Sequence, residues 1–183
     1  MTEIAPNMQD YEIAYRDERL EVPEFFNFGF DVIDRWAEDR TKLALLSVDP
    51  SGNNARHHTF WDLKVLSDKY ANALRDLGIK KGDRVFIMLP QIPEWYVALL
   101  GLFKLGAVPM PGTTLLKPKD IEYRINQAEA VMAITDTENA ANVEEAAGSC
   151  QSLKFLASVG EEKRGWLSFH QQVEQTSSVL EGV

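Results

Sequence analysis

The chain has 183 residues, 45% of them hydrophobic, which is enough to bury the core of one α/β domain. Lys and Arg total 19 against 28 Asp and Glu, so the net charge is −9. This acidic balance argues against nucleic acid as a partner, because surfaces that bind nucleic acid are basic. It does not exclude ATP or CoA, since a few local donors can hold an anion whatever the net charge.

The single cysteine, Cys150, cannot form an internal disulfide, so nothing requires an oxidising compartment. The polar, acidic N-terminus has neither the basic start nor the apolar core of a targeting leader, and we expect a cytoplasmic protein. The longest apolar stretch runs from Trp95 to Phe103, far below the roughly 20 residues that a transmembrane helix needs. We therefore expect no membrane span.

The first elements are predicted from local patterns. Residues 1–24 are charged and sparsely apolar, which predicts an arm that packs on the surface or lacks order. Apolar residues from Phe25 to Trp36 recur at helical spacing and predict a helix whose aromatic face turns inward. Two strand-like runs, Leu43–Val48 and Ala55–Phe60, flank a turn signal at residues 49–52 and predict a hairpin.

Two helices follow with clear local signals. Thr59 and Asp62 have the spacing of a capping box, and Gly78 is placed to end the helix that they begin. The helix from Glu94 to Lys104 is apolar nearly all round, so we expect other elements to cover it on most sides. Gly101, in its middle, lowers helix propensity and predicts that a neighbour packs closely there.

Strands and helices then alternate, which predicts parallel pairing with right-handed connections. The fold class that we expect is α/β: a layered, largely parallel sheet with helices on both faces, plus an N-terminal helix and hairpin. The expected organisation is an arm (1–24), a domain (25–175) and a tail (176–183). The predicted strands are Arg84–Leu89, Ala107–Met110, Val131–Thr135 and Leu153–Val159; the helices are Glu94–Lys104, Pro118–Ala128, Glu138–Ala147 and a last one that starts within residues 165–169.

No motif of a self-sufficient active site is present: the sequence has no Walker loop, GxGxxG, HExxH or Gly-x-Ser-x-Gly. His57 and His58 stand beside the predicted hairpin turn, where a solvated loop is a better interpretation than a metal site. Cys150 follows a helix end and is expected to be a structural thiol. We predict no catalytic residue and no metal site in this chain.

Two basic clusters and one loop are candidates for phosphate binding. Lys80, Lys81 and Arg84 form the first cluster, and the second consists of Lys117, Lys119 and Arg124. Solvated turns carry such residues routinely. The loop from Pro111 to Pro118 is the better candidate, because it leaves the carboxyl end of a predicted strand and leads to a helix N-terminus, where α/β sheets bind ligands.

Four short motifs, within residues 59–63, 81–85, 89–95 and 104–109, resemble in order and spacing the AMP-forming acyl-CoA synthetases of the adenylate-forming family. Two further stretches, Phe26-Asn27-Phe28 with residues 31–36, and Pro111-Gly112-Thr113, resemble its medium-chain branch. The resemblance runs from about Phe25 to Phe169. The four motifs are Thr-Phe-Trp-Asp-Leu at 59–63, Lys-Gly-Asp-Arg-Val at 81–85, Leu89-Pro90 with Pro-Glu-Trp at 93–95, and Lys-Leu-Gly-Ala-Val-Pro at 104–109.

The resemblance implies the N-terminal subdomain of an enzyme that converts a fatty acid, ATP and CoA into acyl-CoA, AMP and pyrophosphate through an acyl-adenylate, with Mg²⁺ accompanying the ATP. It also implies that Thr113, Thr114 and Leu115 line the CoA entrance. The family's phosphate loop and C-terminal lid have no counterpart before Val183. We therefore expect a front portion that is inactive alone and binds none of these cofactors by itself.

Three interpretations remain open from the sequence. The chain can be the N-terminal segment of a medium-chain-type synthetase, a stand-alone binding or interaction module without catalysis, or part of an aryl- or amino-acid-adenylating relative. The partners implied are a small carboxylic acid, ATP and CoA. An isolated front segment would also expose surface that other segments normally cover, which predicts either self-association into a homo-oligomer or poor solubility.

Overall fold

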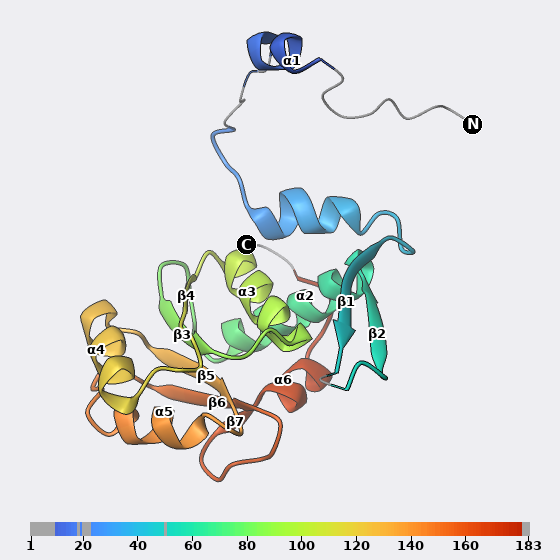
Figure 1. Cartoon of the computed structure of the whole chain (residues 1–183). Coiled ribbons are helices and arrows are strands. Elements are labelled where there is room, and N and C mark those ends of the chain that lie inside the picture. The colour runs from blue at the N-terminus through green and yellow to red at the C-terminus, as the bar shows by residue number, and fades with distance from the viewer. Residues whose placement is uncertain (1–9, 18, 20–22, 50, 181–183) are drawn as a thin grey trace.

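A parallel five-stranded sheet forms the centre of the molecule, in the order β4-β3-β5-β6-β7 (Figure 1). The structure is a computed structural model that describes residues 10–17, 19, 23–49 and 51–180. The other residues, including part of the predicted arm and tail, lie outside the described part. The strands are β3 (Arg84–Met88), β4 (Val108–Pro111), β5 (Met132–Asp136), β6 (Phe155–Val159) and β7 (Leu167–Ser168).

Helices cover both faces of this sheet, as the sequence predicted. Strand β3 is buried on both sides, so its side chains alternate between two cores. Val85 and Ile87 belong to the core under α2, α3 and α6, whereas Phe86 and Met88 belong to the core under α4 and α5. The helices are α2 (Phe60–Asp76), α3 (Pro93–Leu105), α4 (Pro118–Ala128), α5 (Ala140–Ala147) and α6 (Phe169–Gln175).

The local signals around α2 and α3 are confirmed. Thr59 Oγ1 accepts a hydrogen bond from Asp62 N at 3.1 Å, and the Asp62 carboxylate accepts one from Thr59 N at 2.8 Å, which completes the capping box. Gly78 follows the helix with φ +87°. Gly101 is the close-approach point of the two helices, because a Cβ there would lie 3.3 Å from Ser67 O and from Ala71 N.

The predicted hairpin is also present, formed by β1 (Leu43–Val48) and β2 (Ala55–Thr59). Hydrogen bonds from Ser51 Oγ and from Asn54 Nδ2, in that order of effect, lower the pKa of Asp49 to about 2. His57 and His58 were predicted in a solvated loop, and this prediction is wrong. His57 and His58 lie within β2, where the pleat turns His57 to solvent and leaves His58 half-buried.

The predicted inward aromatic face of the first helix is wrong. A π-helix, η1 (Gly29–Asp34), occupies this region, and Phe25, Phe28 and Trp36 are all exposed. The buried residues are Gly29, Ile33 and Ala37, at intervals of four. Gly29 explains which side of η1 is buried. A Cβ there would lie 2.6 Å from Lys104 Cγ, so the helix approaches the rest of the protein through its smallest residue.

The arm contains a short helix, α1 (Tyr11–Asp17), which the sequence did not predict. None of its residues is buried, and the expectation for the arm, packing on the surface or lack of order, stays a prediction. In Figure 1 this helix stands apart from the sheet and its covering helices.

The last helix begins within the predicted residues 165–169, but the short strand before it and the contacts of the tail were not expected. The final helix, α6, begins at Phe169 after the two-residue strand β7, and Ser168 caps it by accepting a hydrogen bond from Gln171 N. The tail was weakly patterned in sequence, yet its described part is held. The Asn72 side chain donates to Ser177 O at 2.8 Å and to Val179 O at 2.9 Å.

A cluster of four charged side chains, with Lys104 and Asp68 buried and Lys64 and Asp34 partly exposed, joins η1, α2 and α3. Lys104 is fully buried and pairs with Asp68 at 2.5 Å and with Asp34 at 2.7 Å. Lys64 completes the cluster at 2.6 Å from Asp68 and 3.2 Å from Asp34. Burial acts to lower the pKa of Lys64, but its bonds to the two carboxylates outweigh this and raise the pKa above its usual value.

Tyr70 packs fully buried against Phe169, with ring centroids 4.4 Å apart, and its hydroxyl has no hydrogen-bond partner among the described residues. Burial raises the pKa of this phenol well above its ordinary value. We expect Tyr70→Phe to leave stability unchanged or raise it by about 1 kcal/mol, because it removes an unsatisfied polar atom and keeps the ring. Urea denaturation checks this, and a clear loss of stability would show that the hydroxyl is satisfied.

Candidate functional site

The strands of a parallel sheet all end at one edge, and ligands bind there where the chain reverses direction across the sheet. From β3 the chain passes to β4 on one side and then returns to place β5 on the other side of β3. The carboxyl end of β3 therefore lies at the switch point. Thr135 Oγ1 donates to Met88 O at 2.9 Å and ties the ends of β5 and β3 together.

A hollow of about 450 Å³ lies at this edge, between the β3–α3 connection and the loop after β4. Gly112 N donates to Ile87 O at 2.8 Å, which extends the pairing of the two strands into the loop. A Cβ at Gly112 would lie 2.9 Å from Leu116 and 3.0 Å from the Phe86 ring, so the loop sits directly on the core. The lining residues are Leu89, Pro90, Gln91, Trp95, Pro111, Gly112, Thr113 and Thr114.

The hollow can bind but has no group for acid–base chemistry. The described residues that line it include the Gln91 amide and the hydroxyls of Thr113 and Thr114, but no ionisable side chain. The Trp95 indole adds an aromatic surface. Such a lining suits stacking and hydrogen bonding with an uncharged part of a ligand. The three histidines and Cys150 lie outside it, and so do the two basic clusters.

The three residues expected at the CoA entrance divide between two positions. Thr113 and Thr114 line the hollow. Leu115 is not among the lining residues and is 81% exposed, because Thr113 Oγ1 accepts a hydrogen bond from Leu115 N and turns the chain outward. Gln91 and Trp95 were not predicted as site residues. Their signal was present, since Gln91 stands in the connection after β3 and Trp95 in the first turn of α3, at the edge where α/β sheets bind ligands.

The helix N-terminus beyond this loop is a weaker anion site than the sequence suggested. The Asp120 carboxylate lies in the first turn of α4 and accepts a hydrogen bond from Lys117 N at 3.2 Å. A negative side chain already occupies the position that an anion would take. The described part of the loop therefore favours an uncharged portion of a ligand.

The other candidates have structural roles or none. Arg84, in the first basic cluster, donates to Ala128 O at 2.7 Å and to Glu129 O at 3.0 Å, so it caps the end of α4 at the opposite edge of the sheet. Cys150 is buried and Ala146 O accepts its hydrogen bond, as expected of a structural thiol. Burial raises the pKa of Cys150, and the charge of Glu122 raises it further. Among the described residues no group of three or more His, Cys, Asp or Glu is arranged to hold a metal.

The profile of the AMP-binding enzyme family matches residues 33–180. The chain belongs to this family. It is 36% identical over 179 residues to the mitochondrial acyl-coenzyme A synthetase ACSM3 of Mus musculus, covering 93% of this chain and 31% of that protein. It is 38% identical over 167 residues to the mitochondrial acyl-coenzyme A synthetase ACSM2 of Rattus norvegicus, covering 87% of this chain and 29% of that protein.

Solved structures of two CoA-forming ligases share the fold. The acyl-CoA synthetase of Brucella canis is 25% identical with a TM-score of 0.79, over 95% of this chain and 32% of that one. The anthranilate CoA ligase AuaEII, solved in complex with anthranoyl-AMP, is 27% identical with a TM-score of 0.76, over 88% of this chain and 30% of that one. The chain thus spans about a third of the length of these relatives.

Two expectations, the absence of a membrane span and a cytoplasmic location, can be compared with these findings. In the described part of the chain, no helix combines the length and hydrophobicity needed to cross a bilayer. The relatives ACSM3 and ACSM2 are named as mitochondrial proteins, which gives no support to the predicted cytoplasmic location. The compartment of this chain stays a prediction.

Proposed function

We propose that this chain is the N-terminal part of an AMP-forming acyl-CoA synthetase of the medium-chain type. The observation that carries the proposal is its similarity to ACSM3, which extends over 93% of the chain. The whole protein would join a fatty acid to CoA through an acyl-adenylate, with ATP as the second substrate. The likeness to an anthranilate CoA ligase favours an aryl acid as the second candidate substrate.

The residues of this chain contribute positioning to that reaction. Adenylate formation needs cationic groups or a metal at the developing phosphate charge. The hollow at the switch point has neither a carboxylate that would hold Mg²⁺ nor a cation among its described lining residues, so we assign neither the metal nor the phosphates to it. We infer that it receives the uncharged pantetheine part of CoA along Thr113 and Thr114, and that the chain alone is inactive.

The substrate class is tested with the full reading frame that contains these residues. Acyl-CoA formation is measured with octanoate, anthranilate and an amino acid in parallel, together with pyrophosphate release by the 183-residue chain alone. We expect turnover with octanoate and none by the isolated chain. Preference for anthranilate would move the assignment to the aryl class, and pyrophosphate release by the isolated chain would contradict our placement of the chemistry in other segments.

The role of the hollow is tested by filling it. In the full-length protein we expect Thr113→Trp to raise the KM for CoA by about tenfold while the rate of adenylate formation, followed by ATP–pyrophosphate exchange, stays unchanged. Leu115→Trp is the matched control, because it adds the same ring two residues away and outside the hollow. Equal effects of the two substitutions on the KM for CoA would contradict this role.

A further inference from the structure

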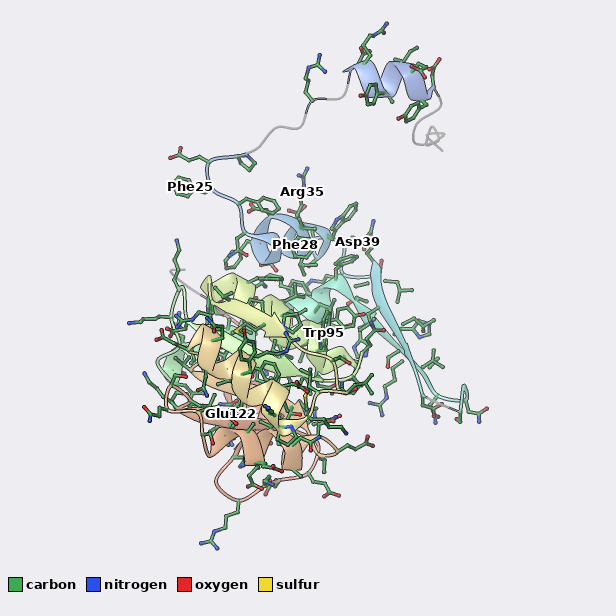
Figure 2. The ribbon with its side chains drawn as sticks, turned by 60° about the vertical axis from the view of Figure 1, so that its left-hand side comes forward. Phe25, Phe28, Arg35, Asp39, Trp95 and Glu122 are labelled. Atoms are coloured by element: carbon green, nitrogen blue, oxygen red, sulfur yellow. The ribbon has the colours of Figure 1, made fainter. Side chains whose placement is uncertain are left out.

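Strand β4 forms one edge of the five-stranded sheet, because β3 is its only neighbour among the described strands. The opposite edge strand, β7, has only two residues, so β4 is the longer of the two edges, and its Val108 is 45% exposed. The β4 side of the molecule comes forward in Figure 2, with η1 and its Phe28 above it and α4 and its Glu122 below. An exposed apolar edge strand is normally a template on which a strand of another chain can pair.

The hydrogen bonds of β4 show which of its backbone groups face outward. The N–H groups of Val108 and Gly112 each donate to a carbonyl of the β3 segment at 2.8 Å, so these two residues face β3. Backbone groups of successive residues in a strand point alternately to its two sides. Met110 therefore also faces β3, and Pro109 and Pro111 face away from the sheet.

Both outward positions of this edge strand are thus prolines, which have no N–H group. The outer side of β4 offers carbonyl acceptors but no donor at Pro109 or Pro111, and a β-ladder requires both donors and acceptors from each strand. We propose that this proline pair prevents a strand of any other chain, including a second copy of this one, from pairing with β4. Proline is tolerated in a sheet at such a place, where the missing N–H would face solvent.

The sequence around β4 contains no other protection for this edge. Residues 105–116 include no charged side chain, although charges, and lysine above all, are the commonest means of keeping edge strands apart. An apolar, uncharged strand without proline has the composition that favours pairing between chains. The two prolines therefore carry the protection by themselves, and any self-association of this chain must use surfaces other than β4.

Sedimentation equilibrium of the 183-residue chain tests the proposal. The double variant Pro109→Thr/Pro111→Thr restores two outward N–H groups, and we expect it to raise the association constant by at least about tenfold over the parent chain. Pro23→Thr/Pro118→Thr is the matched control, because it removes two prolines that lie outside the strands. An association constant no higher than that of the control would overturn the proposal.

Two further measurements separate pairing at β4 from association caused by loss of the fold. Val108→Lys, added to the double variant at an exposed position, should reverse the increase, because a lysine on an edge strand opposes pairing. The new amides at 109 and 111 should also exchange with solvent more slowly as the protein concentration rises. Association that survives Val108→Lys, or amide exchange that does not depend on concentration, would show that the contact lies elsewhere and that the proposal is wrong.

Discussion

Lys104→Met is expected to lower the free energy of unfolding by about 3 to 5 kcal/mol, the usual cost of removing one partner from a buried ion pair. The substitution keeps most of the side-chain volume but removes one of the two cations that the carboxylates of Asp68 and Asp34 share. Lys64 can compensate only in part, since it already contacts both. Urea denaturation followed by tryptophan fluorescence measures the loss.

Lys163→Met provides the control. Lys163 also forms a lysine–carboxylate pair, 2.8 Å from Glu144, but its side chain is 30% exposed and that of Glu144 is 56% exposed, whereas Lys104 and Asp68 are buried. Surface pairs contribute about 0 to 1 kcal/mol, so a small effect is expected. The double variant Lys104→Met/Asp68→Leu should recover part of the stability, because it removes the buried carboxylate together with the buried cation that faces it. If Lys104→Met lowers the free energy of unfolding no more than Lys163→Met does, the ion pairs of Lys104 do not stabilise the fold as we expect.

Gly101→Leu is expected to cost about 3 kcal/mol, at the upper end of what overpacking a core produces. The two closest neighbours of its Cβ after the Tyr70 ring are backbone atoms of α2, which cannot rotate away as a side chain would. The helices must therefore separate along their contact, and the core between them loosens. Thermal unfolding and urea denaturation both report this loss.

Two comparisons isolate the steric cause. Gly101→Ala should have a much smaller effect, because the higher helix propensity of alanine, up to about 1 kcal/mol, offsets a contact that is only a few tenths of an ångström too close. Gln127→Leu places the same side chain on an exposed position of α4 and should change stability by no more than about 0.5 kcal/mol. A destabilisation by Gly101→Leu no larger than that of Gln127→Leu would mean that the α2–α3 contact is not tight.

Sequence reasoning predicted a ligand-binding site at the edge of the sheet where the hollow lies. It identified only some of the residues that line the hollow. The loop after β4 was expected to bind a ligand because it leaves a parallel strand, and Thr113 and Thr114 do line the hollow. Gln91 and Trp95 come from the β3–α3 connection and the first turn of α3, about twenty residues earlier. Their share in the lining depends on β3 and β4 lying side by side, and strand order is a property of the whole sheet.

Short-range patterns therefore determined much of this protein. The capping box of Thr59 and Asp62 and the helix end at Gly78 each depend on groups within a few residues, so the sequence alone was sufficient to predict them. The alternation of strands and helices likewise predicted a parallel sheet covered on both faces, because a parallel pair requires a long crossover connection.

The tertiary structure alone decided which side of each element is buried. Lys104 stands at the end of a helix, where a lysine ordinarily reaches solvent, yet it is fully buried because Asp34 and Asp68 approach it from 70 and 36 residues away. Phe25 and Phe28 are apolar and yet exposed, since η1 approaches the body through Gly29. Burial depends on which distant segments come together, and the free energy of those contacts can outweigh the local preference of a single side chain.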